Sequence, residues 1–301
     1  MRLLVSMCSR TDEAPECLVL CDPDRRLIQP IAVPNPAMGA FGLCLTPSTV
    51  YLDFDLGRPA EEEPERSELC ALDAATLRVR WRYSFKLGRD VHSIVAGDGG
   101  MYAVSTGTDE LLRLGLDADG RVTSEEIVWR ADSDDERADR HHVNDVAVVG
   151  GQLLVSGFGP RPGPTAWEDA RDGFVRSVAD GSVVLGPLYH PHSICDLGSG
   201  EFAVCESPRR RIVTSADRIS SPLPGYARGL CIAEAKLYVG TSRNRHPSEP
   251  LSILPYDRSS APAGEGIVAI CELDLLTLEL ERVIELHPYG REIYDLVEMS
   301  P

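Results

Sequence analysis

Two histidines in matching local settings are the residues of this chain best suited to carry out chemistry. His92 lies in a Val-His-Ser-Ile phrase, and His192 lies in a Pro-His-Ser-Ile phrase. Histidine transfers protons near neutral pH and is a common ligand of zinc, iron, copper and nickel. Because the two phrases are nearly the same, we expect both histidines to occupy equivalent positions in a repeated structure.

The phrase recurs four more times, each time with a different residue in its second place. These second residues are Phe41, His92, Asn144, His192, Arg228 and Tyr294. Short strands that recur with a period of roughly 50 residues are typical of the blades of a β-propeller. We therefore expect an all-β, six-bladed β-propeller in which each phrase forms the innermost strand of a blade. The six second residues then form one ring around the central channel.

The elements that position this ring include both ends of the sequence. Residues 292–299 are expected to supply the inner strand of the sixth blade, and residues 3–8, 17–21 and 27–33 its outer three strands. A blade shared by the N- and C-terminal strands fastens the ring and leaves no open sheet edge. No linker composition interrupts the strands, so we expect a single propeller domain over residues 1–301.

The histidines of the ring predict a metal site. In a strand, residues two apart share a face, so His142 and His190 extend the channel lining next to Asn144 and His192. We expect a divalent transition metal such as Zn, Fe, Ni or Cu, rather than Ca, held by His92, His192, Asn144 and His142. Two alternatives stay open: an acid–base role of the histidines without a metal, and a structural role in which they bond to one another and to trapped water.

The other polar ring residues predict contacts to a substrate. Arg228 needs an anion in a channel, which is either a carboxylate of the protein (Asp145, Asp295 or Glu206) or the carboxylate or phosphate of a ligand. Tyr294 is suited to donate a proton or a hydrogen bond. Asp145 and Asp295 directly follow ring residues. They either cap backbone groups and orient a neighbouring histidine, or take part in catalysis as His92, His192 and Tyr294 would.

Three long loops are expected on the face where the inner strands begin. They are residues 55–67, 158–173 and 241–266. Long loops in a compact fold are often lids or binding loops. The second loop carries Arg161 and Trp167, and the third begins with Arg243. We expect Trp167, Arg243 and Phe41 to join Arg228 in binding the substrate.

Composition excludes several classes of partner. The formal net charge is −17, which disfavours nucleic acid and anionic lipid. No apolar run reaches the ~18 residues of a membrane span, and the first residues do not make a secretory leader. The nine cysteines lie mostly in apolar strands without CxxC spacing, which favours core packing in a reducing compartment. We expect a cytoplasmic monomer or homodimer that binds neither nucleic acid nor membrane.

Several phrases resemble those of an uncharacterised bacterial family of six-bladed propellers. They are Asn-Asp at 144–145, Pro-His-Ser at 191–193, Leu-Pro-Gly-Tyr-Ala-Arg-Gly-Leu at 223–230 and Val-Gly-Thr-Ser-Arg at 239–243. The chain is more distantly similar to the gluconolactonase/regucalcin group, whose members hold a divalent cation in the channel with carboxylate and Asn side chains. That resemblance implies an ion near Asn144. The early glutamate of the pattern has no counterpart, because Phe41 and His92 hold the first two ring positions.

These features together predict a metal-assisted hydrolase or lyase that acts on a small anionic metabolite at the channel mouth. The metal would polarise a carbonyl or activate water, Arg228 would hold the anion and Tyr294 would serve as acid. The alternative is a non-catalytic propeller, a scaffold or ligand sensor whose acidic rim binds a protein partner.

Overall fold

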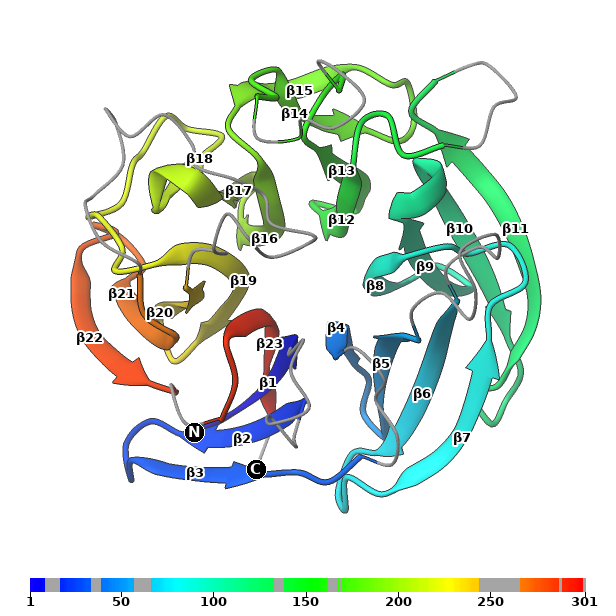
Figure 1. Cartoon of the computed structure of the whole chain (residues 1–301), viewed down its shortest axis with the longest axis horizontal. Coiled ribbons are helices and arrows are strands. Elements are labelled where there is room, and N and C mark those ends of the chain that lie inside the picture. The colour runs from blue at the N-terminus through cyan, green and yellow to red at the C-terminus, as the bar shows by residue number, and fades with distance from the viewer. Residues whose placement is uncertain are drawn as a thin grey trace.

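Six antiparallel sheets are arranged around a central axis like the blades of a propeller (Figure 1). The computed structural model describes residues 1–8, 17–33, 39–56, 66–132, 138–161, 167, 169–243, 266–286 and 289–299. Within these residues the fold is all-β, with two short 3-10 turns, η1 (Thr106–Thr108) and η2 (Ser207–Arg209). No helix there has the length and hydropathy needed to span a membrane. The predicted fold class is confirmed.

Each blade begins with one of the repeated phrases. Blade 1 contains β4 (Ala40–Leu45), β5 (Thr49–Asp55), β6 (Ser67–Asp73) and β7 (Val79–Ser84). Blade 2 contains β8 (Val91–Gly97), β9 (Gly100–Ser105), β10 (Glu110–Leu116) and β11 (Val122–Arg130). Blade 3 contains β12 (Val143–Val149), β13 (Gln152–Gly157), β14 (Gly173–Ser177) and β15 (Val183–Leu188).

The remaining blades follow the same plan with one difference. Blade 4 has three strands, β16 (Pro191–Gly198), β17 (Glu201–Glu206) and β18 (Arg211–Thr214). Blade 5 contains β19 (Tyr226–Ala233), β20 (Lys236–Ser242), β21 (Ala269–Asp274) and β22 (Leu280–Glu285). Blade 6 contains β23 (Glu292–Met299), β1 (Arg2–Cys8), β2 (Leu18–Asp22) and β3 (Leu27–Pro30).

Blade 6 joins the two ends of the sequence, as predicted. The C-terminal strand β23 lies innermost and pairs antiparallel with β1, with Leu4 opposite Val297 and Val5 opposite Leu296. Strands β2 and β3 complete the sheet outward. The ring is therefore closed by hydrogen bonds between the first and last strands rather than by a loop.

A ring of small and acidic residues connects neighbouring blades near the axis. Its members each follow a residue of the predicted channel ring: Gly42, Ser93, Asp145, Ser193, Gly229 and Asp295. Ser93 donates a hydrogen bond to Asp145 at 2.6 Å, and Asp145 also accepts one from the backbone N–H of Ile194. Ser193 accepts from the N–H of Gly229 at 2.8 Å.

The same inter-blade ring closes through blades 5, 6, 1 and 2. A Cβ atom on Gly229 would stand 3.0 Å from Cα of Asp295, so only glycine permits this approach. Asp295 accepts from the N–H of Leu43 at 2.9 Å, and a Cβ on Gly42 would stand 2.8 Å from Cα of Ser93. Each blade thus contacts the next through its innermost strand, which fixes the residues that line the channel.

Cysteines pack as core residues, as their sequence context predicted. Cys205 and Cys271 are buried free thiols inside the apolar cluster between blades 4 and 5. Burial raises the pKa of the Cys271 thiol to about 12 and that of Cys44 to about 11. A thiol that stays protonated at neutral pH is a poor nucleophile and metal ligand, which fits a packing role.

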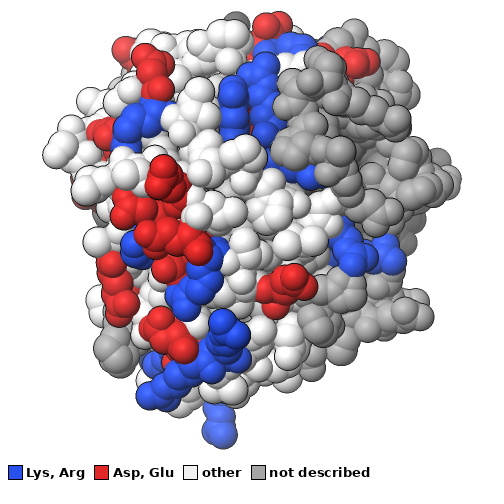
Figure 2. Space-filling view, turned by 90° about the vertical axis from the view of Figure 1, so that its left-hand side faces the viewer, with Lys and Arg blue, Asp and Glu red and all other residues white. Residues whose placement is uncertain are grey.

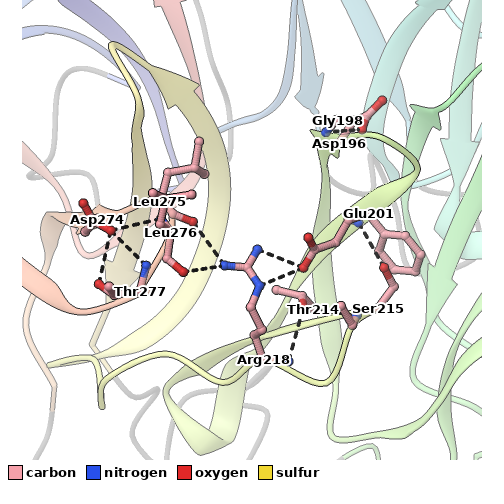
Figure 3. Close-up of polar contacts among 12 residues, drawn as sticks. Asp196, Gly198, Glu201, Thr214, Ser215, Arg218, Asp274, Leu275, Leu276 and Thr277 are labelled. Atoms are coloured by element: carbon pink, nitrogen blue, oxygen red, sulfur yellow. Dashed lines mark hydrogen bonds and ion pairs between the residues drawn. The ribbon is translucent and has the colours of Figure 1, made fainter.

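Arg218 compensates for the missing fourth strand of blade 4. Its Nε donates to Glu201 on β17 at 2.9 Å, and its Nη1 donates to the carbonyl oxygens of Leu275 and Leu276 at 3.2 and 2.8 Å. Figure 3 shows that these carbonyls belong to the turn between β21 and β22 of blade 5. One guanidinium therefore bridges two blades where strand pairing is absent.

We expect Arg218→Ala to lower the free energy of unfolding by about 1–2 kcal/mol, since it removes charge-assisted hydrogen bonds that are partly exposed to solvent. The measurement is the urea midpoint of the variant against wild type. Arg121→Ala, which removes an exposed arginine, is the matched control and should leave the midpoint unchanged. Equal midpoints for the Arg218 variant and wild type would show that the bridge does not contribute to stability.

Charges of both signs are interspersed on the side of the molecule shown in Figure 2. This side carries β21 and β22 of blade 5. Arg282 is paired there with Glu272, and Lys236 lies 2.8 Å from Glu281. Acidic side chains of this blade are thus neutralised locally by basic neighbours.

Candidate functional site

The six residues predicted to line the channel form a ring of nearly buried side chains. Each belongs to an innermost strand, as the repeated phrase predicted. In every blade the pairing register between the first two strands shifts by one residue at the ring position or beside it. Such bulges re-aim a side chain and are common next to active sites. The repeated register shift thus gives six side chains the same position relative to the axis.

Aromatic and cationic side chains at the channel mouth form a closed cycle of contacts. Ring centroids are separated by 5.2 Å for Phe41–His92, 5.5 Å for His92–His142, 4.5 Å for His142–Phe158, 5.1 Å for Phe158–His192 and 5.7 Å for His192–Tyr226. The Arg228 guanidinium lies 5.0 Å from the ring of Tyr226 and 5.2 Å from that of Tyr294, and Tyr294 lies 4.7 Å from Phe41. The cycle restrains every member in one orientation.

His92 is held in place by a neighbouring carboxylate. Its Nε2 lies 3.0 Å from Oδ1 of Asp90, which is two residues earlier and on the same side of the chain. Its Nδ1 is buried and has no hydrogen-bond partner in the described part of the chain. A carboxylate that accepts from one ring nitrogen fixes the tautomer and leaves the other nitrogen basic.

His192 is held as a neutral imidazole. Its Nδ1 donates to the carbonyl oxygen of His190 at 3.0 Å and lies 2.8 Å from Oγ of Ser207. Burial, followed by the charge of Arg228, holds its pKa well below the usual value. Burial also lowers the pKa of His190 to about 3. Neither histidine therefore becomes a cation at neutral pH.

The four predicted metal ligands do not come together as a metal centre. Among the residues that the structure describes, no group of three His, Cys, Asp or Glu side chains is placed to hold a metal ion. His142 and the buried ring of Phe158 lie between His92 and His192 along the cycle. The amide of Asn144 donates to the carbonyl of Pro191 and accepts from Ser156, so both its ends are engaged. Repeat equivalence placed these residues on one ring but gave no distance between them.

Arg228 has an internal counter-ion that is not among the three carboxylates expected from the sequence. Its Nη1 lies 3.0 Å from Oε2 of Glu292, the first residue of β23. The three expected partners, Asp145, Asp295 and Glu206, form other contacts instead. Of the described atoms near it, none accepts a hydrogen bond from Nε of Arg228.

Tyr294 presents a second unpartnered polar atom to the channel. Its hydroxyl oxygen is buried and makes no hydrogen bond within the described residues. Burial holds the phenol pKa well above its usual value, so the hydroxyl stays protonated. Its ring lies 5.4 Å from that of His92 and next to the Arg228 guanidinium, so three polar groups from three blades converge here.

Asp145 lies in the inter-blade ring rather than in the aromatic cycle. Its two oxygens accept hydrogen bonds from the Ser93 hydroxyl and the Ile194 N–H. The second of these bonds caps a backbone group, which is one of the two roles expected for Asp145 from the sequence. Burial raises its pKa to about 6, and burial raises that of Asp295 to about 7. Both carboxyls are thus engaged in holding blades together.

The loop after β13 contributes to the mouth as expected. Trp167 lies 5.0 Å from the ring of His142, and Arg161 lies 5.0 Å over the Trp167 ring. Arg243 directly follows β20, and its backbone N–H donates to the carbonyl of Arg291 at 3.3 Å. Parts of the three predicted binding loops lie outside the described residues: 57–65, 162–166, 168 and 244–265.

Three residues of the site were missed from the sequence. Asp90 stands two residues before His92, and a search for partners at that spacing would have found it. Glu292 stands two residues before Tyr294, but its partner Arg228 belongs to another blade. Phe158 begins the second predicted loop and was not among its expected binding residues, yet it is fully buried among His142, His190 and His192.

Comparison with known families places the chain in a group without an assigned activity. The profile of a domain of unknown function, DUF4915, matches residues 74–300. The chain belongs to this family. A search of curated proteins gives no match. The predicted membership in an uncharacterised propeller family is therefore confirmed, and it extends beyond the phrases that first indicated it.

Solved structures with the same fold span a range of functions. This DUF4915 protein superposes on a protein of unknown function from Bacteroides caccae with a TM-score of 0.64 and 13% identity. The match covers 100% of this chain and 99% of that one. The periplasmic gluconolactonase of Pseudomonas aeruginosa gives 0.58 and 13%, over 99% of both. The calcium-binding protein regucalcin from Agrobacterium tumefaciens gives 0.56 and 16%, over 87% and 78%. At such identities the likeness shows the fold alone.

Proposed function

We propose that this DUF4915 protein is an enzyme of the hydrolase or lyase class that acts on a small anionic metabolite at the channel mouth. The observation that carries this proposal is the convergence of three buried polar atoms without described partners: Nδ1 of His92, Oη of Tyr294 and Nε of Arg228. A buried polar group left unpaired costs about 1–3 kcal/mol. Groups kept in this state at one place are typical of a site completed by a ligand.

The chemistry of the three atoms defines what would complete the site. Arg228 and Tyr294 both donate hydrogen bonds, and Arg228 is positively charged, so they fit the oxygens of a carboxylate or an oxyanion. Glu292 holds the guanidinium from the opposite side through Nη1, which leaves Nε directed elsewhere. The aromatic cycle excludes water around these donors and so strengthens their interactions with an anion.

His92 is the proton-transferring group in this proposal. Asp90 accepts the hydrogen of Nε2, so the bare Nδ1 is the base. It would take a proton from water that attacks an ester or lactone carbonyl, or from a carbon next to a carboxylate. The Tyr294 hydroxyl would donate to the oxygen on which negative charge develops. No step is assigned to a metal ion, because the described donor set does not fit one.

The structural neighbours support the class of reaction without naming the substrate. The Pseudomonas aeruginosa neighbour is a gluconolactonase, and opening a lactone is a hydrolysis that needs a base and a group to stabilise an oxyanion. The Agrobacterium tumefaciens neighbour is a calcium-binding protein. Elemental analysis of the purified protein tests for the transition-metal ion that the sequence predicts. The described residues give no reason to expect one bound equivalent.

The test is a screen of lactones, carboxylate esters and hydroxy acids with wild type and His92→Asn. We expect the variant to lose 10²–10⁴-fold in kcat, the typical contribution of a positioned base, with little change in KM. The matched control is His141→Asn, because His141 is also paired to a carboxylate, at 2.9 Å from Asp132, but stands outside the aromatic cycle. Asp90→Asn should lose less and shift the pH profile.

Two outcomes would overturn the catalytic assignment. The first is a substrate whose turnover is the same in wild type and His92→Asn. The second is a ligand that binds at the mouth and is never converted, with binding that survives replacement of His92, His142, His190 and His192. The second result would favour the non-catalytic scaffold or sensor over the enzyme.

A further inference from the structure

We infer that His192 makes the channel site selective for a small acid that carries a hydroxyl group next to its carboxylate. Of the two histidines in the ring, His92 is the base of the proposed mechanism, whereas His192 has no part in it. The unused imidazole presents a neutral hydrogen-bond acceptor beside Arg228, the residue proposed to bind the anion. This inference rests on the proposed function and names its substrate class, a 2-hydroxy acid.

The contacts of Nδ1 fix which nitrogen of His192 carries the hydrogen. Nδ1 lies 3.0 Å from the carbonyl oxygen of His190 and 2.8 Å from Oγ of Ser207. Because a carbonyl oxygen can only accept, Nδ1 carries the hydrogen of the neutral imidazole and Nε2 carries a lone pair. The hydrogen bonds that His192 makes within the described residues all use Nδ1. Nε2 is therefore an acceptor without a partner in this part of the chain.

Burial keeps this acceptor uncharged and away from bulk water. His192 is 3% exposed, and the rings of Phe158 and Tyr226 lie 5.1 and 5.7 Å from its own. Burial, followed by the charge of Arg228, holds the pKa of His192 well below its usual value, so Nε2 does not gain a hydrogen at neutral pH. A buried acceptor without a partner lowers stability, and a ligand that donates to it recovers that free energy on binding.

The acceptor and the guanidinium that binds the anion belong to neighbouring inner strands, β16 and β19. Ser193 and Gly229 directly follow His192 and Arg228, and Oγ of Ser193 accepts a hydrogen bond from the N–H of Gly229 at 2.8 Å. Tyr226 also contacts both residues, because the Arg228 guanidinium lies 5.0 Å from the same ring that His192 contacts. A small molecule bound to Arg228 is thus placed next to His192.

The charge of Arg228 determines which donor group fits this acceptor. The guanidinium disfavours a second positive charge on His192, and it disfavours an ammonium group of a ligand at the same place. A hydroxyl group donates a hydrogen bond without carrying charge. A hydroxyl on the carbon next to a carboxylate places donor and anion in one small molecule. A site that bonds a substrate hydroxyl strongly rejects the analogue without it, because the acceptor is then left unpaired.

The experiment is calorimetric titration with pairs of acids that differ by one hydroxyl: glycolate with acetate, racemic lactate with propionate, and malate with succinate. We expect wild type to bind a hydroxy acid about 10–100-fold more tightly than its partner. His192→Phe keeps an aromatic ring without the acceptor and should reduce this ratio to about one. His192→Gln, whose amide oxygen accepts hydrogen bonds, should retain part of it. His141→Phe, outside the aromatic cycle, is the matched control and should keep the wild-type ratio.

Equal affinities within every pair, or no saturable binding of any of these acids, overturn the inference. A wild-type ratio in a His192→Phe variant with an unchanged thermal midpoint does the same. If that variant does not fold, nitrogen-15 NMR of histidine-labelled wild type decides: the signal of a bare Nε2 should shift when the hydroxy acid is added, and an unchanged spectrum contradicts the assignment.

The binding preference and the proposed activity can fail separately. His92→Asn removes the proposed base and leaves the acceptor, so it should keep the ratio between hydroxy acid and partner. A retained ratio without turnover of any substrate would remove the catalytic assignment alone. Turnover of a substrate with no preference for the hydroxyl would remove the role of His192 alone.

Discussion

A chain that stops at Arg291 should not form a cooperatively folded propeller. The deletion removes β23, the inner strand of blade 6, whose side chains Ile293, Leu296 and Met299 are buried. Burying one large apolar side chain contributes about 1.5–3 kcal/mol, so these three alone approach the 5–15 kcal/mol that stabilises a typical domain. The deletion also exposes the edge of β1 and removes the Asp295 contact to blade 1.

The measurement is the thermal transition followed by circular dichroism, together with resistance to proteolysis. The control ends at Met299 and keeps all of β23, so it should melt as the intact chain does. A synthetic peptide with residues 290–301, added to the truncated chain, should restore part of the transition. If the truncated chain alone melts within a few degrees of the intact protein, closure through β1 and β23 is not what stabilises the ring.

The fold was predictable because the repeated phrase occurs at the same structural position, the start of the inner strand, in every blade. The repeated phrase marks the start of every inner strand, since each blade needs an apolar strand next to the axis and a residue that faces the channel. The three-stranded blade 4 was not predicted, because its outer edge is completed by Arg218 and by a single bridge between Val213 and Ile219. Neither feature leaves a periodic pattern in the sequence.

The sequence predicted which residues lie on the ring but not which of their side chains contact one another. Repeat equivalence placed His92, His192 and Arg228 on the same ring, where they lie. It could not show that Phe158 packs between two of the histidines, because that contact depends on how a loop folds over the mouth. This contact bears on the choice between a metal site and an acid–base site, since an ion needs its ligands in direct contact with it.

The contribution of Asp145 and Asp295 to stability should fall as the pH rises from about 4 to about 7, while His190 and His192, whose pKa values burial lowers, contribute in the opposite direction. Burial raises the folded-state pKa of Asp145 to about 6, and burial raises that of Asp295 to about 7. In the unfolded chain both carboxyls titrate near the ordinary value of about 4. Between these limits the folded protein holds protons that the unfolded chain has released, so raising the pH favours unfolding.

The size of the effect follows from the shifts. One pKa unit corresponds to about 1.4 kcal/mol, so Asp145 accounts for about 3 kcal/mol and Asp295 for about 4 kcal/mol across this window. The contribution is fully present below the unfolded-state pKa, decreases through the window and is lost above pH 7. Asp53, whose pKa burial also holds well above its usual value, adds to the same trend.

Asp145→Asn tests most directly whether the Asp145 carboxyl contributes to the pH dependence of stability. An amide keeps the shape of the carboxyl: its oxygen can accept from the Ile194 N–H, and its NH₂ group can donate to the Ser93 hydroxyl. We expect the variant to lose about 2 kcal/mol of the pH dependence in urea titrations between pH 4.5 and 7.5 and to be more stable than wild type at pH 7.5. Asp119→Asn, at an exposed turn, should keep the wild-type slope. An unchanged slope in the Asp145 variant would mean that this carboxyl is ionised in the folded ring, and the inter-blade contact would then be charged rather than neutral.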